Sequence, residues 1–446
     1  MERLIVIGGV AAGLSAASAA KKLKKDSMDV TVFEKTGYVS YGACSEPYYI
    51  SGIVPNPDDL IEVTPEDLEK KRKMHVFRRH EVVKVEYDKG MLDVLDIDRG
   101  VVSTHPFDYL VITTGAIAKR LGVKGEGMNG ICTLRTVEDA TKIKASASSA
   151  EQVAICGGGY IGLEMAEAFR HMGKEVTVLK KTAQMLMNFD PKMSSIVEEE
   201  VRSKGVKIIT GVDILSFEGD NRVQQVITSE GAIPAQTVLI SKGAVPNTSL
   251  ALSFGVKTGK TGAIEVDLHQ KTNLDRVYAA GDCAEAHHLI LDGPAYIPLG
   301  TTANKTGRVA GENIGGLDTG FWGIVGTGVS KIFDLEVART GLSLDEAQKN
   351  GLDAYATTIT HGSRSGHYPG GSPLYVHLVT QSGTRKLLGA QIVGREGAAL
   401  RINTLAAALH AGMSVDDLYH LDMGYAPPFA PVWDAVLIAA NKARKG

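Results

Sequence analysis

The stretch RLIVIGGVAAG, residues 3–13, sets the predicted architecture of the N-terminal part of the chain. Residues 4–7 form a short apolar run typical of a buried strand, and the glycines permit a tight turn before an alanine-rich helix expected over residues 14–23. A second strand is predicted over residues 30–33 and ends at Glu34, about twenty residues beyond the turn. In such a unit the helix N-terminus offers free N–H groups to a pyrophosphate, and the acidic residue accepts hydrogen bonds from ribose hydroxyls. We therefore expect a dinucleotide site here.

A second unit of the same kind begins at QVAICGGGYIG, residues 152–162. The strand that follows its helix, expected over residues 175–179, ends in Lys180 and Lys181 rather than in an acid. Two lysines at the position that ordinarily binds the ribose hydroxyl favour a 2′-phosphate, and hence NADPH over NADH. The alternative is that both lysines lie in solvent.

The remaining segments complete an α/β architecture. Two more predicted strands run into small-residue turns, at residues 107–116 and 277–282. From about residue 321 the composition changes, because β-branched and polar residues alternate over 325–400 and helices are expected over 398–411 and 432–443. The fold class predicted is α/β, with two Rossmann-like dinucleotide-binding domains and a separate C-terminal α+β domain.

Composition narrows the classes of function. A chain of 446 residues with 44% hydrophobic and 22% charged residues is expected to form two or three globular domains. The net charge of −3 gives no indication of nucleic-acid binding, and no apolar run is long enough for a membrane span. A predicted strand begins at Leu4, so no signal peptide is expected, and four scattered cysteines suit neither a disulfide framework nor a metal site. We expect a cytoplasmic protein without a metal.

Cys44 is the candidate for chemistry. It lies in GYVSYGACSEPY, residues 37–48, ten residues after Glu34. A dinucleotide held by the first turn and Glu34 would place its reactive ring where the chain could carry this thiol. We therefore predict that Cys44 is a redox thiol.

These segments together make the chain resemble, over essentially its whole length, the flavin- and pyridine-nucleotide-dependent disulfide reductase superfamily. The resemblance rests on the two glycine-rich turns, on TTGA at residues 113–116, on AGD at residues 280–282 and on the C-terminal domain. The branch it resembles most contains coenzyme A disulfide reductase, NAD(P)H oxidases, peroxidases and polysulfide reductases. That branch carries a single cysteine in Ser-x-x-x-Cys-x-x-Pro-Tyr, matched by Ser40, Cys44, Pro47 and Tyr48, and the run YAPPFAPVWD at residues 425–434 also matches it.

The resemblance implies cofactors, domains and an assembly. FAD and NADPH or NADH are the expected cofactors, with coenzyme A as a mixed disulfide on Cys44, and the protein is expected to be a homodimer acting on a small-molecule disulfide or sulfur substrate. The expected domains are an FAD-binding domain in two parts, an NAD(P)H-binding domain between them and a dimerisation domain. Their limits are, in that order, residues 1–115 and 246–322, residues 116–245, and residues 323–446.

The resemblance also implies site residues. For FAD they are Gly8, Gly9, Ala12, Gly13, Glu34, Lys35, Thr114, Gly115, Gly281 and Asp282. For NAD(P)H they are Gly157, Gly159, Tyr160, Ile161, Gly162, Glu164, Lys180 and Lys181. Tyr160 is expected to cover the flavin until nicotinamide arrives, and Glu164 to bind the nicotinamide side. The substrate-binding residues implied are Ser40, Lys22, Pro47 and Tyr48. The catalytic residues implied are Cys44, Tyr425 and Tyr368, with both tyrosines acting across the dimer interface as proton donors.

Reductases with two cysteines carry Cys-x-x-x-x-Cys, but position 49 here is Tyr49. The single thiol would therefore cycle through a mixed disulfide, a persulfide or a sulfenic acid. The thiol needs a lowered pKa. Pro47 suggests that a helix begins here, and the N-terminus of that helix would supply part of the stabilisation of the thiolate.

Residues around Cys44 depart from the branch, which commonly has Asn before the cysteine and Gly-Leu after it. Here Ala43 precedes Cys44, and Ser45 and Glu46 follow. We expect Glu46 to add a negative charge that raises the pKa of Cys44 and repels a polyphosphate ligand. The specificity for coenzyme A is therefore open.

The function predicted is NAD(P)H-dependent reduction of coenzyme A disulfide, or of related disulfides, persulfides or polysulfides, through Cys44. An oxidase or peroxidase working through a Cys44 sulfenic acid is the alternative. Peroxidase relatives have a histidine in the first glycine turn, where this chain has Val10, Ala11 and Ala12. A non-catalytic redox-sensing flavoprotein is a third possibility, disfavoured by the intact second turn.

Overall fold

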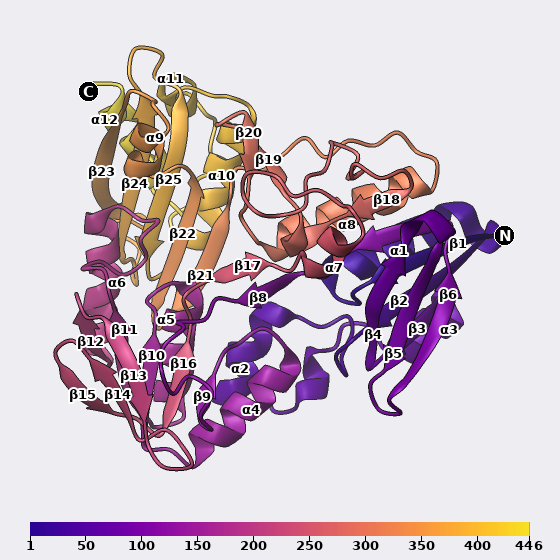
Figure 1. Cartoon of the computed structure of the whole chain (residues 1–446). Helices are drawn as coiled ribbons and strands as arrows, with labels where there is room; N and C mark the ends of the chain where they lie inside the picture. Colours follow the sequence, from indigo (N-terminus) through magenta and orange to yellow (C-terminus); the bar gives the residue numbers. More distant parts are fainter. Residues whose placement is uncertain (446) are drawn as a thin grey trace.

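A five-stranded parallel sheet forms the N-terminal part of this computed structural model, which describes residues 1–445 (Figure 1). Its strand order is β18-β7-β1-β2-β3. The strands are β1 (Glu2–Ile7), β2 (Met28–Glu34), β3 (His75–Arg78), β7 (Tyr109–Ile112) and β18 (Val277–Ala279). Strand β18 comes from a part of the chain that lies beyond the second nucleotide unit, so the first unit is built from two separate segments, as the sequence predicts.

Helices α1 (Ala11–Lys24) and α8 (Gly300–Ile314) lie against each other beside this sheet. The contact is between backbones, because a Cβ added at Gly307 would lie 2.1 Å from the carbonyl oxygen of Ala12. Smaller elements surround the unit. They are α2 (Glu46–Ser51), α3 (Pro65–Arg72), the antiparallel strands β4 (His80–Glu86), β5 (Met91–Asp96) and β6 (Val101–Pro106), α7 (Ser249–Ser253), and the pair β19 (Ala286–His288) and β20 (Gly293–Ala295).

The second unit has its own five-stranded parallel sheet, in the order β12-β11-β10-β16-β9. These strands are β9 (Ile131–Cys132), β10 (Gln152–Cys156), β11 (Glu175–Lys180), β12 (Lys207–Thr210) and β16 (Thr237–Ile240). Helices α4 (Val137–Ser148), α5 (Tyr160–His171) and α6 (Pro191–Ser203) accompany it, with a small antiparallel sheet of β13 (Ile214–Glu218), β14 (Gln225–Thr228) and β15 (Gly231–Pro234). The two chain crossings between the units pair with each other as β8 (Ala116–Ala118) and β17 (Ala244–Pro246).

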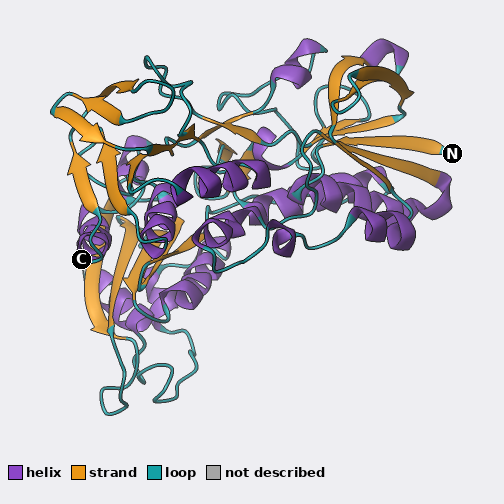
Figure 2. Ribbon diagram, turned by 90° about the horizontal axis from the view of Figure 1, so that it is seen from below, coloured by secondary structure: helices purple, strands orange, loops and turns teal. Residues whose placement is uncertain are grey.

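The C-terminal unit is an antiparallel sheet in the order β21-β22-β25-β24-β23. The strands are β21 (Gly328–Ile332), β22 (Leu335–Gly341), β23 (Ala354–Gly362), β24 (Pro373–Gln381) and β25 (Leu387–Gly394). Its helices are α9 (Leu344–Lys349), α10 (Ala398–His410), α11 (Val415–Tyr419) and α12 (Ala435–Ala443). The predicted α/β fold with a C-terminal α+β domain is confirmed, and the two chain ends lie at opposite sides of the molecule (Figure 2).

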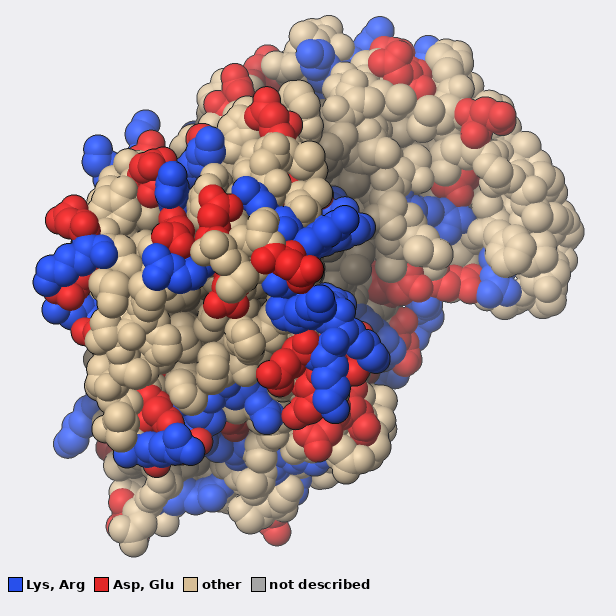
Figure 3. All heavy atoms as spheres, turned by 90° about the vertical axis from the view of Figure 1, so that its right-hand side faces the viewer, with Lys and Arg blue, Asp and Glu red and all other residues tan. Residues whose placement is uncertain are grey.

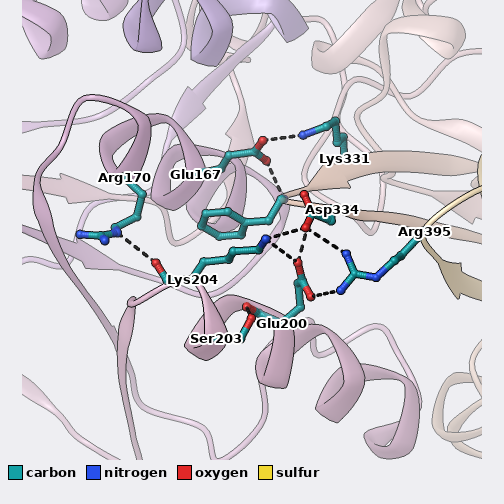
Figure 4. A network of polar contacts seen from close by, with 9 residues as sticks. Glu167, Arg170, Glu200, Ser203, Lys204, Lys331, Asp334 and Arg395 are labelled. Atoms are coloured by element: carbon teal, nitrogen blue, oxygen red, sulfur yellow. Dashed lines mark hydrogen bonds and ion pairs between the residues drawn. The ribbon is translucent and has the colours of Figure 1, made fainter.

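An ionic network joins the second unit to the C-terminal sheet (Figure 4). Lys204, which follows α6, contacts Asp334, in the turn between β21 and β22, at 2.5 Å, and Arg395 contacts both Asp334 (2.9 Å) and Glu200 (3.1 Å). On α5, Glu167 accepts hydrogen bonds from Lys331 (2.6 Å) and from the backbone N–H of Phe333 (2.7 Å). These contacts fix the orientation of the second unit relative to the C-terminal one. Within residues 1–445, no helix has the length and apolarity that a bilayer crossing requires.

A buried ion pair organises the end of the chain, and it provides a test of stability. Arg401 on α10 contacts Asp434 at 2.8 Å, with side chains only 11% and 5% exposed, and Asp434 also caps α12 by accepting a hydrogen bond from the N–H of Val436. We predict that Asp434→Ala lowers the unfolding free energy of the C-terminal unit by about 3–5 kcal/mol, because it leaves the Arg401 guanidinium buried and unpaired. Urea unfolding followed by circular dichroism measures the change.

The matched control is Asp345→Ala, which removes the exposed pair with Lys349. Exposed pairs are screened by solvent, so this variant should unfold close to the wild type. Equal shifts in the two variants would contradict the prediction.

Candidate active site

The first glycine turn brings β1, α1 and β7 into backbone contact. A Cβ at Gly8, whose φ is 107°, would lie 2.3 Å from the carbonyl oxygen of Thr113, and a Cβ at Gly13 would lie 1.9 Å from the carbonyl oxygen of Gly8. Larger residues cannot occupy these positions without moving the backbone. The turn therefore packs tightly against β7 and leads directly into the N-terminus of α1, which is the arrangement that a pyrophosphate site requires.

Glu34 lies beside this turn at the end of β2. Its side chain is buried, with one carboxylate oxygen accepting a hydrogen bond from the N–H of Gly9 (2.7 Å) and the other from the N–H of Thr36 (2.8 Å). The predicted FAD residue Lys35 follows it and is exposed. Ser40 returns to the same turn, where its N–H donates to the carbonyl of Gly9 at 3.0 Å. Ser40 has a φ of 51°, a strained value for a residue that is not glycine.

The third border of the first site comes from the 3₁₀ turn Gly281–Cys283. A Cβ at Gly281 would lie 2.8 Å from the Cβ of Ala12, so this turn touches the start of α1. Asp282 accepts a hydrogen bond from Arg135 at 3.1 Å. On the other side, Thr114 donates a hydrogen bond to the carbonyl of Asn247, and Gly115 follows it with a φ of 67°.

Arg135 was not predicted from the sequence. It precedes α4 and reaches Asp282 across 147 positions of the chain, and neither residue lies in a periodic pattern that could have linked them. Its Nε is buried without a hydrogen-bond partner among residues 1–445, as is the hydroxyl of Tyr296. Unpaired donors of this kind, beside a glycine cradle and two fixed carboxylates, fit a dinucleotide with phosphates and ribityl hydroxyls.

The second glycine turn repeats this geometry. Gly157 has a φ of 135°, and a Cβ at Gly162 would lie 2.2 Å from its carbonyl oxygen. Gly159 has open space where a Cβ would be, and Ile161 in the first turn of α5 is exposed. The turn is therefore compatible with a second nucleotide whose pyrophosphate approaches the backbone at Gly159.

The two lysines after β11 differ. The aliphatic stem of Lys180 lies on the second turn, 3.2 Å from where a Cβ on Gly158 would be, and partial burial lowers the pKa of Lys180. Lys181 is exposed and pairs with Asp213 at 2.8 Å. Of the two lysines, only Lys180 therefore lies at the turn.

Tyr160 and Glu164, on α5, are both partly buried. The Tyr160 ring packs edge-on against Phe189, with 6.1 Å between ring centroids, and its hydroxyl is buried without a partner in the described chain. Glu164 accepts a hydrogen bond from Ser330 of β21 at 2.6 Å, and burial raises the pKa of Glu164. This contact ties the helix that carries both residues to the C-terminal sheet.

Cys44 is exposed, in the 3₁₀ turn Ala43–Ser45 immediately before α2, which has Pro47 in its first turn. The pKa of Cys44 is raised, mainly by partial desolvation of the thiol and then by Glu164, Glu46 and Asp282, with Arg135 opposing. The lowered pKa expected from the helix N-terminus is therefore wrong for the polypeptide alone. A helix of one and a half turns stabilises the thiolate less than these carboxylates and desolvation destabilise it.

Tyr48 and Pro47 lie on the same short helix. Pro47 is buried, and the pKa of Tyr48 is raised by burial and by Glu164, Glu167 and Cys44. The phenol of Tyr48 is thus within electrostatic reach of the Cys44 thiol.

Glu46 differs from its predicted behaviour. It was expected to present a charge that repels a polyphosphate, but its side chain is only 3% exposed and therefore does not face a ligand in solvent. Burial, followed by Asp139, raises the pKa of Glu46 to about 8, so most of it is uncharged at neutral pH. The other half of the expectation is confirmed, because Glu46 does raise the pKa of Cys44.

Tyr368 and Tyr425 lie on two loops of the C-terminal unit and are 38% and 48% exposed. Ser365 joins these loops by donating to the carbonyls of Pro427 and Ala430. Arg401 strengthens the connection with hydrogen bonds to the carbonyls of Ser363 and Phe429. Within residues 1–445 no hydrogen bond joins either tyrosine hydroxyl to Cys44, and the catalytic role of the two tyrosines stays a prediction.

Lys22 is exposed in the last turn of α1. On the face shown in Figure 3, basic and acidic side chains are interspersed, and neither charge dominates a broad area.

Comparison with known proteins identifies the family. The family model described as "Pyridine nucleotide-disulphide oxidoreductase" matches residues 2–307, and the model of the dimerisation domain of the same family matches residues 329–436. The chain is 39% identical over 443 residues to an "NAD(P)H coenzyme A polysulfide/persulfide reductase" of Pyrococcus horikoshii, covering 99% of this chain and 98% of the relative.

Two solved structures share the fold. An NAD-dependent persulfide reductase from A. fulgidus aligns with a TM-score of 0.96 and 34% identity, over 99% of this chain and 83% of that one. The water-forming NADH oxidase of Lactobacillus brevis, bound to NADH, aligns with a TM-score of 0.95 and 26% identity, over 100% and 98%.

The two glycine cradles, the fixed carboxylates beside the first and the antiparallel C-terminal sheet agree with these matches. The family uses FAD and NAD(P)H, and its members are redox enzymes. The chain belongs to the pyridine nucleotide-disulphide oxidoreductase family.

Proposed function

We propose that this enzyme uses NAD(P)H to reduce coenzyme A disulfide, or a related disulfide, persulfide or polysulfide, through Cys44. The observation that carries the proposal is the electrostatic environment of this exposed thiol. Asp282 of the first nucleotide site and Glu164 of the second unit both act on Cys44. The influence of both units on one thiol supports our proposal that Cys44 receives the electrons that NAD(P)H supplies through the first site. The printed name of the Pyrococcus relative, which joins coenzyme A to polysulfide and persulfide, supports the substrate class.

The chemistry requires one reactive sulfur. Bound FAD would supply the two-electron connection between NAD(P)H and the thiol, held by Gly8–Gly13, Glu34 and Asp282. The Cys44 thiolate attacks a substrate disulfide, so that a bond forms between Cys44 and one substrate sulfur while the substrate S–S bond breaks. The leaving thiolate takes a proton, and the two electrons from NAD(P)H then cleave the mixed disulfide and release the second thiol.

The proton donors we propose are Tyr425 and Tyr368, acting across a homodimer interface. Their loops are tied to each other by Ser365 and Arg401 and lie beside exposed apolar side chains. These side chains are Phe429, Val432 and Trp433, between 50% and 77% exposed. Apolar exposure of this extent is typical of a surface that another chain covers, which supports dimerisation through this face.

For the nicotinamide cofactor, we propose NADPH, with Lys180 binding the 2′-phosphate. Lys180 follows the strand β11 and borders the second turn, whereas the ammonium of Lys181 is engaged by Asp213. Tyr160 and Glu164 are proposed to meet the nicotinamide end, and Lys22, Ser40, Pro47 and Tyr48 to line the substrate approach.

Replacing Cys44 tests the central step. Cys44→Ser should lose NAD(P)H-dependent thiol release by about two orders of magnitude or more, because a serine oxygen cannot form the mixed disulfide. Reduction of bound flavin by NAD(P)H should persist in stopped-flow absorbance. The matched control is Cys132→Ser, which changes another partly exposed thiol and should keep full turnover.

Unabated thiol release by Cys44→Ser would exclude the proposal. Intact-protein mass spectrometry of the wild type separates it from the oxidase alternative. A coenzyme A or sulfur adduct on Cys44 supports the reductase, whereas a single added oxygen supports a sulfenic acid and an oxidase.

The nucleotide preference is tested by comparing two lysine variants. Lys180→Ala should raise the KM for NADPH by about tenfold, because it removes an ammonium from the 2′-phosphate, and should leave the KM for NADH nearly unchanged. Lys181→Ala should change the NADPH-to-NADH ratio much less. Steady-state kinetics with both nucleotides measure this ratio, and equal effects of the two substitutions would contradict the assignment to Lys180.

A further inference from the structure

Glu46 is a buried acid for which the fold offers no hydrogen-bond partner. Its side chain is 3% exposed, and its Oε1 is buried without a hydrogen-bond partner within residues 1–445. Native proteins seldom leave a buried carboxyl oxygen unpaired, because the group loses its hydrogen bonds to water and forms none with the protein. The residue lies two positions after Cys44, where α2 begins.

The groups around Glu46 are mostly acidic. From the segment containing α4, Asp139 and Glu138 disfavour its charge and Arg135 favours it. Two of these neighbours are themselves incompletely paired, since Glu138 Oε2 and Arg135 Nε are buried without partners in the described chain. The guanidinium of Arg135 is engaged by Asp282 at 3.1 Å. No cation is therefore dedicated to Glu46.

The other elements packed against α2 add no cation either. Helix α5 contributes Glu164, which acts on Cys44 and Tyr48, and the loop after β2 contributes Tyr41, whose pKa is raised in part by Glu46. The ammonium of Lys144 on α4 lies over the Tyr49 ring and bonds the carbonyl of Tyr49. In the 3₁₀ turn Pro57–Leu60, Asp59 accepts a hydrogen bond from the N–H of the capping residue Asn56, and Asp58 acts on Tyr38.

A buried acid in this setting lowers the free energy of unfolding as the pH rises. In the unfolded chain Glu46 ionises at its ordinary pKa of 4.5, whereas burial holds its folded pKa near 8. A raised carboxyl pKa means that the native state loses stability as the pH rises from the first value to the second. Glu46 therefore destabilises the fold at neutral pH, and a buried acid two positions from the reactive thiol is a candidate for a role in its chemistry.

We propose that Glu46 is a proton-controlled positioning residue for Cys44: once Glu46 has lost its proton, its negative charge opposes ionisation of the thiol, and this opposition is absent while Glu46 is protonated. The two groups repel each other only when both carry a negative charge, so their titrations are coupled. Glu46 does not touch substrate in this role and acts only through the sulfur. The consequence is a thiolate whose availability rises less steeply above neutral pH than that of an isolated cysteine. This inference deepens the proposed function, since it rests on Cys44 being the working thiol.

The test measures ionisation of Cys44 directly. The FAD-loaded enzyme is reduced, freed of reductant, and treated with iodoacetamide between pH 6 and pH 10, and alkylation of the Cys44 peptide is followed by mass spectrometry. We compare the wild type with Glu46→Gln, which keeps the size of the side chain, and with Glu46→Leu, which restores the residue expected in the branch. The matched control is Glu66→Gln, an exposed carboxylate in the first turn of α3.

At pH 6, where Glu46 is uncharged, all four proteins should react at similar rates. At pH 9 both Glu46 variants should react about threefold to tenfold faster than the wild type, because they lack the charge that repels the thiolate. Coincident profiles would overturn the proposal. A constant ratio at every pH would overturn it as well, since that result indicates a structural change around the sulfur rather than a titrating charge.

These outcomes are independent of the proposed substrate. Failure of the proposed function would appear as thiol release that survives Cys44→Ser, whereas failure of this inference would appear only in the alkylation profiles. Retained FAD absorbance and a cooperative melting transition confirm that each variant folds. Both Glu46 variants should also melt at higher temperature than the wild type near pH 8, because neither carries a buried acid.

Discussion

Close approach between backbones at the first glycine turn is the constraint on which the arrangement of this molecule depends. Gly8 and Gly13 let β1, α1 and β7 meet, and Gly307 and Gly311 let α8 lie directly on α1. Side chains at these positions would separate the two helices by the width of at least a methyl group. The turn that carries Asp282 also packs closely on the start of α1, because a Cβ at Gly281 would lie 2.8 Å from the Cβ of Ala12. The first site is therefore complete only because residues about 270 positions apart pack without intervening side chains.

The thiol environment follows from the same arrangement. Cys44 belongs to the first unit, but the groups that set its ionisation come from elsewhere: Arg135 from the start of α4, Glu164 from α5, and Asp282 from the returning segment. Glu164 in turn hydrogen-bonds to Ser330 of the C-terminal sheet, and the network around Asp334 and Arg395 holds that sheet against α5 and α6. The pKa of the Cys44 thiol thus depends on how all three units are placed relative to one another. A rigid connection between units is useful to an enzyme that must keep two nucleotides and a thiol in register.

The sequence predicts local features well and contacts between distant segments poorly. The two glycine turns, Glu34 and the parallel strands follow from spacing within about thirty residues, and the fold class built on them is confirmed. Arg135 was missed because its partner Asp282 is 147 positions away and no periodicity links them. The different environments of Lys180 and Lys181 were within reach of prediction, since side chains alternate at the end of a strand and only one of two successive residues can face the turn. The burial of the Glu46 side chain could not be predicted, because α4 and α5 decide which face of the short helix α2 is buried. Neither helix is part of the local sequence around Glu46.

Burial of Glu46 changes how its charge must be counted. A formal sequence count assigns it −1, and that count led to the expectation of a repelled polyphosphate. In the folded protein the acid is surrounded by other carboxylates and desolvated, so it keeps its proton near neutral pH and exerts little field on a ligand outside. The same residue still acts on Cys44, because the thiol lies two positions away along the chain and is itself partly desolvated. The effect of an acidic residue on the pKa of a nearby thiol therefore depends on whether protein or water lies between the two groups.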